Sequence, residues 1–364
     1  MVVRWIAALA AFLAVIAIGA ITIGNFGTGI DPDNFFDTEG ADSFALIGAI
    51  ALVIAFVVYA VVEYAQTGGL ASIGRQFDTR TIVLMPIAVA INIILGATVA
   101  NALKIPIYLD SIGTILVGVL AGPVAGALTG FLTNVLWTYV IPPPFQNGPA
   151  AAFGIVAVVI GVLAGLAGRS GWMRPRPNRS AGELALGGLV ALAVVTGLTV
   201  YAYTRFYGET FEFFNPDNTD VVFTILGWLI GAIFVAFIVG FLGLLFIRRD
   251  LTVAYVTVAG VLTGIVAALI SAPISANVFG GVTGGGTDFL VAAFRQAGAD
   301  IQAATFQQGL LSDPVDKLVT FFVVYLILSA MARRTKARFP QGERLIEGGA
   351  DVDPEEGEWR SASA

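Results

Sequence analysis

The chain has 364 residues, a net charge of −6, and 57% hydrophobic against only 12% charged residues. Soluble domains carry about 25% charged residues, so this composition, with a mean hydropathy of +0.87, indicates an integral membrane protein. Cysteine and histidine are absent, which excludes disulfides, thiolate metal sites and a Ser-His-Asp triad. No GxxxxGK[ST] phosphate loop occurs either. We therefore expect a protein that is not an enzyme, binds no metal, carries no cofactor of its own and does not bind nucleic acid.

Apolar runs predict an all-α protein with ten transmembrane helices, because about 20 apolar residues in a helix cross a bilayer core. The run 111–140 is too long for one crossing and contains Gly122-Pro123, where proline breaks or kinks a helix. It is therefore interpreted as two helices, 110–121 and 123–140. The other predicted helices are 5–24, 44–62, 82–103, 149–168, 184–204, 221–247, 251–271 (ending before Pro273) and 314–333.

Loop charges set the predicted orientation, because positively charged loops stay in the cytoplasm. Arginine and lysine concentrate in every second loop, at Arg4, 75–80, 169–179, 248–249 and 333–344, whereas the other loops hold only Lys104, Arg205 and Arg295. This predicts a multi-pass protein of the plasma membrane with cytoplasmic N- and C-termini. The first run is interpreted as a retained helix, with a signal peptide as the alternative. An acidic outer loop (25–43) and a disordered polar tail (339–364) complete the prediction.

The most informative segment is SAPISANVFGGVTGGGTDF, residues 271–289, which contains five glycines within 280–286. Irregular backbone at membrane depth is tolerated only where it is buried in protein or lines a wet cavity. The segment is therefore a candidate binding site, whose free amides would hold an acidic or carbonyl-bearing ligand. The alternative is a tight re-entrant turn, with Thr287 or Asp288 capping a short helix. Residues 300–311 are amphipathic and are expected to cover the outer surface as a lid.

The sequence DPVDK at 313–317 resembles a helix start, with Asp313 as N-cap, Pro314 at the first helical position and Asp316 facing free N–H groups. Lys317 does not fit that role, because a cation in the first turn opposes the helix dipole. Adjacent helical residues do not face each other, so Asp316 is not expected to neutralise it. The alternative is that Lys317 reaches the outer surface. Otherwise its anionic partner should be Asp288, Asp110 or a ligand.

Other polar residues are expected at the same outer level. Tyr108 and Asp110 lie between two predicted helices, although Asp110 can also be an N-cap. Asn134 needs a hydrogen-bond partner at its depth, whereas Trp137 and Tyr139 are interpreted as interfacial residues. Phe145 and Asn147 are within reach of the site. The predicted substrate-binding residues are Tyr108, Asp110, Asn134, Asn277, Gly281, Thr283, Asp288, Asp316 and Lys317.

Three stretches carry a family resemblance: IPIYLDSIGTILVGVLAGPVAGALTGFLTN (105–134), the glycine segment (271–289) and LSDPVDKLVTFFVVYLIL (311–328). In this order they resemble the substrate-binding (S) components of energy-coupling factor transporters. The resemblance implies a six-helix core that binds a small nutrient, often a vitamin, near the outer face. A separate transmembrane coupling protein and two ATPases, which alone use ATP, would drive release inward. The implied parts are a helix pair at 1–64, core helices at 82–168 and 251–333, and an inserted pair at 184–247.

A ridge with a four-residue period lies on the first predicted core helix, at Ala88, Asn92, Gly96 and Ala100. Small residues so spaced let another helix approach closely. S components typically use such residues to contact the coupling protein, so the resemblance implies a partner contact here. Packing within this chain's own bundle is the alternative. The rival functions are a ligand-sensing membrane receptor and a self-sufficient secondary transporter.

Overall fold

The computed structural model describes residues 2–23, 39–207, 221–296 and 298–346, and no strand occurs among them. Most of the acidic loop predicted at 25–43, including Asp31, Asp33 and Asp37, lies outside the described residues, as does the predicted tail from residue 347 onward. The main helices are α1 (Val2–Ile23), α2 (Glu39–Thr67), α4 (Thr79–Gly96), α5 (Ile112–Ala121), α6 (Pro123–Tyr139), α7 (Gly154–Arg169), α8 (Ala181–Tyr207), α9 (Val221–Arg248), α10 (Thr252–Phe279), α11 (Asp288–Gln296) and α12 (Ile301–Ala330). Short elements are α3 (Ala71–Gly74), the π-helix η1 (Ala97–Ala102), the 3-10 helices η2 (Gly148–Phe153) and η4 (Gly342–Leu345), and α13 (Arg333–Lys336).

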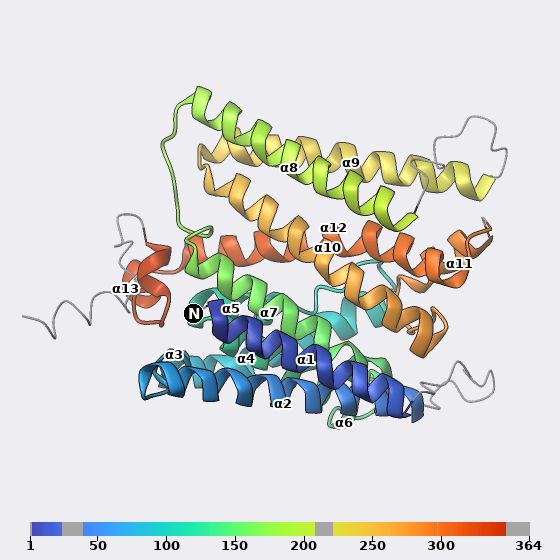
Figure 1. Cartoon of the computed structure of the whole chain (residues 1–364). Coiled ribbons are helices and arrows are strands. Elements are labelled where there is room, and N and C mark those ends of the chain that lie inside the picture. Colours follow the sequence, from blue (N-terminus) through green and yellow to red (C-terminus); the bar gives the residue numbers. More distant parts are fainter. Residues whose placement is uncertain (1, 24–38, 208–220, 297, 347–364) are drawn as a thin grey trace, which may run out of the picture.

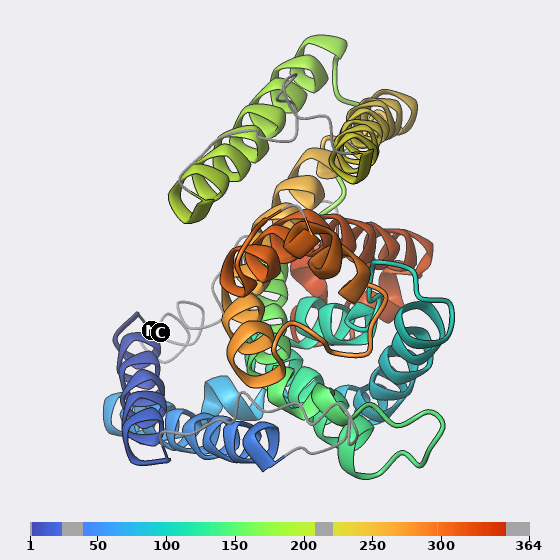
Figure 2. The same ribbon diagram turned by 90° about the vertical axis from the view of Figure 1, so that its right-hand side faces the viewer.

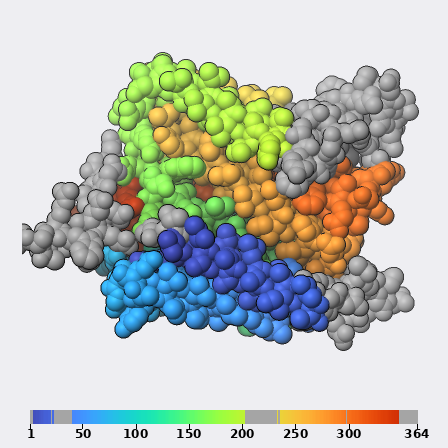
Figure 3. Space-filling model, in the orientation of Figure 1, coloured from blue at the N-terminus to red at the C-terminus, as the bar shows by residue number. Residues whose placement is uncertain are grey.

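The helices run side by side in a central bundle flanked by two pairs (Figure 1). The bundle contains α4 to α7, α10 and α12, with α1 and α2 on one side and α8 and α9 on the other (Figures 1 and 2). Five of the helices within the described ranges are long and apolar enough to cross a membrane, and three further apolar helices are shorter. On the face seen in Figure 3, α7 (green) and α10 (orange) of the bundle are visible between the two pairs. The prediction of an all-helical fold is thus confirmed for the described residues, and the long apolar helices are consistent with a membrane protein, while the count of ten spans stays a prediction.

The predicted break at Gly122-Pro123 is confirmed. Gly122 adopts φ of 132°, a conformation that favours glycine, and Pro123 is the first residue of α6. The side chain of Gln76 accepts a hydrogen bond of 2.8 Å from the Val124 N–H, one of the free amides at the start of α6. On the same end of the bundle, the N–H of Gln341 donates to the Leu120 carbonyl at 2.8 Å. Residues 339–346, placed in the tail by the sequence, are therefore packed against the core.

Two predicted helix boundaries are wrong, because α10 and α12 continue through their prolines. Helix α10 runs past Pro273 to Phe279. Helix α12 begins at Ile301, where the Asp300 side chain caps it by accepting from the Ala303 N–H at 2.8 Å, and Pro314 lies in its interior. Membrane helices tolerate proline because neighbouring helices and side chains satisfy the freed backbone groups. Residues 300–311 are thus the first part of α12 rather than a separate cover.

Close backbone contacts at glycine hold α10 against α12. The position that a Cβ at Gly264 would take is occupied by the Asp313 carbonyl oxygen and by Pro314. Gly260 is similarly close to the backbone of Leu318. Such contacts require small residues at the crossing. They place the polar stretch 312–317 inside the bundle instead of at its surface.

A larger side chain at the α10–α12 crossing should destabilise the folded protein. We expect Gly264→Ala to lower the free energy of unfolding by about 1–3 kcal/mol, because the methyl group would force two backbones apart. Gly197 in α8 is the matched control, since nothing lies within 4 Å of its Cβ position, and Gly197→Ala should stabilise its helix by about 0.5–1 kcal/mol. Unfolding of both variants in the same detergent measures the difference, and equal effects would contradict this packing.

The ridge predicted to contact a partner helix faces the interior, and the structure corrects that prediction. Ala88 and Asn92 are 0% exposed and Ala100 is 3% exposed, while a Cβ at Gly96 would meet the ring of Trp137. The exposed side of α4 instead carries aliphatic residues. These are Ile82, Val83, Ile87 and Ile94.

Asn92 shows why the ridge points inward. Its amide donates to the hydroxyls of Thr114 (2.9 Å) and Thr133 (3.1 Å), and its oxygen accepts from the Gly113 N–H at 2.7 Å. This one side chain satisfies a free amide in the first turn of α5 and joins α4, α5 and α6. The four-residue period was correct as a packing signal, but it serves this chain's own bundle.

Candidate functional site

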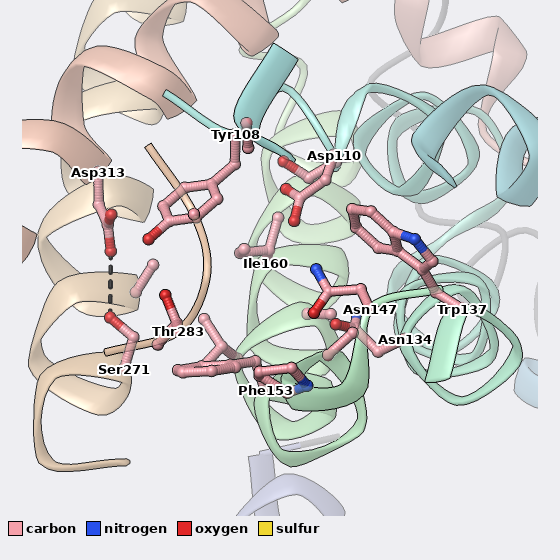
Figure 4. A pocket seen from close by; sticks show the side chains of 18 of the residues that line it. Tyr108, Asp110, Asn134, Trp137, Asn147, Phe153, Ile160, Ser271, Thr283 and Asp313 are labelled. Carbon is pink, nitrogen blue, oxygen red and sulfur yellow. Dashed lines mark hydrogen bonds between the residues drawn. The ribbon is translucent and has the colours of Figure 1, made fainter. Parts of the chain in front are cut away.

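A cavity of about 100 Å³ lies between α6, α7, α10, α12 and the two connections 103–111 and 280–287. Its wall combines charged, amide and aromatic side chains that converge from these elements (Figure 4). The polar and aromatic lining residues are Asn101, Tyr108, Asp110, Ser111, Asn134, Trp137, Asn147, Phe153, Ser271, Thr283, Asp313 and Lys317.

Lys317 is buried with its charge paired inside the protein. The ammonium group donates to the Asp316 carboxylate and to the Ser111 hydroxyl at 2.9 Å, and it lies 3.6 Å from Asp110 Oδ1. The prediction of Asp110 as a partner is confirmed. The expectation that Asp316 does not face Lys317 is wrong, because the long lysine stem lets the ammonium reach back to the adjacent carboxylate. Asp288 is not among these partners, and Lys317 does not reach the surface.

Asp316 holds the connection 103–111 over the cavity. Its Oδ1 accepts the backbone N–H groups of Tyr108 at 3.1 Å and of Leu109 at 2.8 Å, and the residue is 0% exposed. Its predicted role at a helix start is wrong, because α12 begins fifteen residues earlier, at Ile301. Asp316 instead joins the middle of α12 to the segment that carries Tyr108 and Asp110.

Asp313 faces the cavity one helical turn before Lys317. Ser271 donates to its Oδ2 and Ser312 to its Oδ1, each at 3.2 Å (Figure 4). The sequence analysis placed Asp313 at a helix N-cap. That predicted role is wrong, because Asp313 lies inside α12, and its place in the cavity wall was not predicted. The spacing of four residues between Asp313 and Lys317 was the available signal, since such residues share one face of a continuous helix.

The glycine segment forms a closed turn whose amides are used internally. Asp288 accepts the N–H groups of Thr283 (3.0 Å) and Gly284 (2.7 Å) and the Thr283 hydroxyl (2.9 Å). Gly280, Gly281 and Gly284 have φ of 58°, 83° and 78°, which explains the need for glycine. Burial raises the pKa of Asp288, although the bonds from Thr283 oppose this shift. The turn is thus a fixed wall of the cavity, and its Thr283 and Gly284 amides are not free to hold a ligand.

Tyr108 fastens the two connections to each other. Its hydroxyl lies 2.7 Å from the Thr287 hydroxyl, and Lys104 adds a second link by donating to the Gly284 carbonyl. Burial raises the pKa of Tyr108 well above its usual value. The phenol therefore stays neutral at physiological pH and acts only through hydrogen bonds.

The remaining wall is formed by amides and aromatic rings. Asn134 donates to the Gly130 carbonyl at 3.0 Å, and the Trp137 indole donates to the Phe145 carbonyl at 2.8 Å. Trp137 is only 2% exposed, so its predicted interfacial role is wrong. The ring of Phe153 stacks on that of Phe279, with centroids 5.6 Å apart.

Not every predicted site residue reaches the cavity. Asn277 is exposed and accepts a hydrogen bond from Gln302, and Gly281 packs against Ile301. Asp288 and Asp316 do not line the cavity themselves, and their carboxylates accept backbone N–H groups of the segments that do. Tyr139 and Phe145 are largely exposed, and Tyr139 donates to Asp42 instead. The predicted substrate-binding residues that line the cavity are Tyr108, Asp110, Asn134, Thr283 and Lys317, and Asn147, which was expected to be within reach, lines it as well.

Comparison with family models, with curated proteins and with solved structures finds no match. Within the part of the chain that the structure describes, no group of acidic side chains is arranged to hold a metal ion. The geometry of the cavity is therefore the basis for assigning a function. Hydrogen-bonding groups and aromatic rings are abundant in its lining, which is the composition of a binding site for a small molecule.

Proposed function

We propose that this protein is the membrane-embedded capture subunit for a small water-soluble nutrient, such as a vitamin or vitamin precursor. It would work as an S component of an energy-coupling factor transporter. The observation that carries the proposal is the polar cavity between the glycine turn and α12, inside a bundle of apolar helices. A solvated ligand needs such a lining because it gives up its water on entering a membrane protein.

The proposed architecture has ten spans around a six-helix core of α4 to α7, α10 and α12. The pairs α1–α2 and α8–α9 are additions to that core (Figures 1 and 2). The proposed division of the chain is 1–64, 82–168, 184–247 and 251–333. Contacts between the arginine-rich segments, such as Arg344 with the Arg169 carbonyl and Arg80 with the Arg338 carbonyl, gather these segments at one end of the bundle. By the positive-inside rule, that end of the bundle would lie in the cytoplasm, beneath the plasma membrane, together with both chain termini. The cavity would then lie near the outer face.

Binding and release would be separate tasks in this proposal. The chain encloses the ligand between the 103–111 connection and the glycine turn, which the Tyr108–Thr287 and Lys104–Gly284 bonds hold together. Opening the cavity requires these bonds to separate. A transmembrane coupling protein and ATPases would supply the energy for inward release, so ATP acts only on the partners. The inward-facing ridge leaves the exposed aliphatic face of α4 as the surface available to such a partner.

The test separates capture from transport. The full chain is placed alone in liposomes and exposed to isotope-labelled riboflavin, thiamine, biotin, cobalamin and queuosine precursors. We expect saturable binding of one compound to these liposomes without its accumulation in the lumen. In membrane vesicles from the organism that makes the protein, which also hold the partner ATPases, we expect the same compound to accumulate. Sustained flux through the chain alone would identify a secondary transporter. Binding that is unaffected by ATPase removal, with no uptake in those membrane vesicles, would identify a receptor.

A further inference from the structure

Acidic side chains outnumber basic ones around the cavity. Lys317 is the cation in the wall, and its ammonium donates to Asp316 and Ser111 and lies 3.6 Å from Asp110 Oδ1. Against this one ammonium stand three carboxylates, those of Asp110 and Asp313 in the wall and that of Asp316 directly behind it. Lys104 is exposed and bonded to Gly284. Among the described residues, an anionic ligand would therefore enter beside three acidic side chains and one ammonium group that already has partners.

Asp110, Asp313 and Asn134 offer open acceptor positions, and the amides of Asn101 and Asn147 line the same cavity. Asp110 lies 3.6 Å from the nearest ammonium, beyond hydrogen-bond distance, and its side chain is 26% exposed toward the cavity. Asp313 receives only two long bonds, from Ser271 and Ser312, although a carboxylate accepts about four. Asn134 is 8% exposed and donates to Gly130, and its oxygen has no hydrogen-bond partner among the described residues. A ligand that donates N–H groups would complete this set.

Aromatic rings form further parts of the wall. Trp137 lies across the cavity from Asp313, next to Asn134 and Asn147, and Phe153 lies along the edge near Thr283 (Figure 4). Aromatic faces attract cations and bury planar rings. A ring held against these walls would present a substituent to Asp110 and Asp313.

From this arrangement we infer that the ligand is a planar ring compound with a positively charged nitrogen group, and that Asp110 and Asp313 determine this specificity. The inference rests on the proposed function, because it names the chemical class that the same cavity captures. The carboxylates accept the N–H groups of the ligand, the Asn134 oxygen accepts a further one, and Trp137 and Phe153 cover the ring. Lys317 positions Asp110 and does not bind an anion.

Three probes of the same ring size and different charge test the inference: benzamidine, benzamide and benzoate. Their binding to the full chain in lipid nanodiscs is measured by titration calorimetry. We expect benzamidine to bind at least about tenfold more tightly than benzamide, and benzoate to bind most weakly, because benzamidine brings an opposite charge to the carboxylates as well as N–H groups. Asp110→Asn and Asp313→Asn should each lower benzamidine affinity more than benzamide affinity and so remove most of this preference. Asp300→Asn, at the N-cap of α12 and outside the cavity wall, is the control and should keep the preference.

Thermal unfolding of each variant verifies that it is folded, and both asparagine variants keep the shape of the native side chain. Tighter binding of benzoate, a preference that survives both asparagine substitutions, or no benzamidine binding at about 10 mM would overturn the inference. The proposed function would stand despite these results if a nutrient still binds and if a substitution that fills the cavity abolishes that binding. If no nutrient binds either, the proposed function falls as well.

Discussion

Replacing Asp316 by alanine should lower the free energy of unfolding by about 3–5 kcal/mol, the largest stability effect that we expect from one substitution in this chain. The variant leaves the Lys317 ammonium buried with Asp110 at 3.6 Å as its remaining carboxylate. It also leaves the backbone N–H groups of Tyr108 and Leu109 without their acceptor. The measurement is unfolding by denaturant in detergent micelles.

Asp300→Ala on the same helix is the matched control for Asp316→Ala. It removes a carboxylate that caps α12 at its exposed start, which typically costs about 1 kcal/mol. The double variant Asp316→Leu with Lys317→Met should recover part of the lost stability, since an apolar pair removes the uncompensated buried charge. An effect of Asp316→Ala no larger than that of Asp300→Ala would contradict the buried pair.

Filling the cavity should abolish ligand capture without unfolding the protein. Ala157 lines the cavity from α7, and we expect Ala157→Phe to weaken nutrient binding by at least about 100-fold, or about 2.7 kcal/mol. The phenyl group would occupy space that is open in the folded protein. The free energy of unfolding should therefore fall by less than the 1–3 kcal/mol that is typical of inserting atoms into a solid core.

Leu166→Phe is the control for Ala157→Phe, because Leu166 is on the same helix and 38% exposed. It should leave both binding and stability unchanged. Saturation binding of the labelled nutrient and unfolding in the same detergent provide the two readouts. Undiminished binding by Ala157→Phe, or a loss of stability beyond about 3 kcal/mol, would show that the space is not the ligand chamber.

The sequence was sufficient for features that depend on local composition. Apolar runs located the helices because a bilayer imposes their length, and Gly122-Pro123 located the turn between α5 and α6 because that backbone conformation requires glycine. The glycine turn and Lys317 were also correctly placed in one polar region, because both are costly at membrane depth without a structural reason.

Features that depend on neighbouring helices were not predictable in the same way. Pro273 and Pro314 do not end their helices, because packing in the bundle compensates for the lost backbone bonds. That error placed Asp313 at a helix start and removed it from the predicted site. The sequence also did not determine whether the Asn92 ridge faces this bundle or a partner, since a four-residue period identifies a packing face but not the helix that covers it.

The most direct test of the central claim, a chamber that holds one small polar molecule, is native mass spectrometry of the intact chain after saturation with the nutrient that it captures. We predict one added ligand mass per chain for the native protein and for Leu166→Phe, and none for Ala157→Phe. A native chain without an added ligand mass, or the same added mass on Ala157→Phe, would contradict the account.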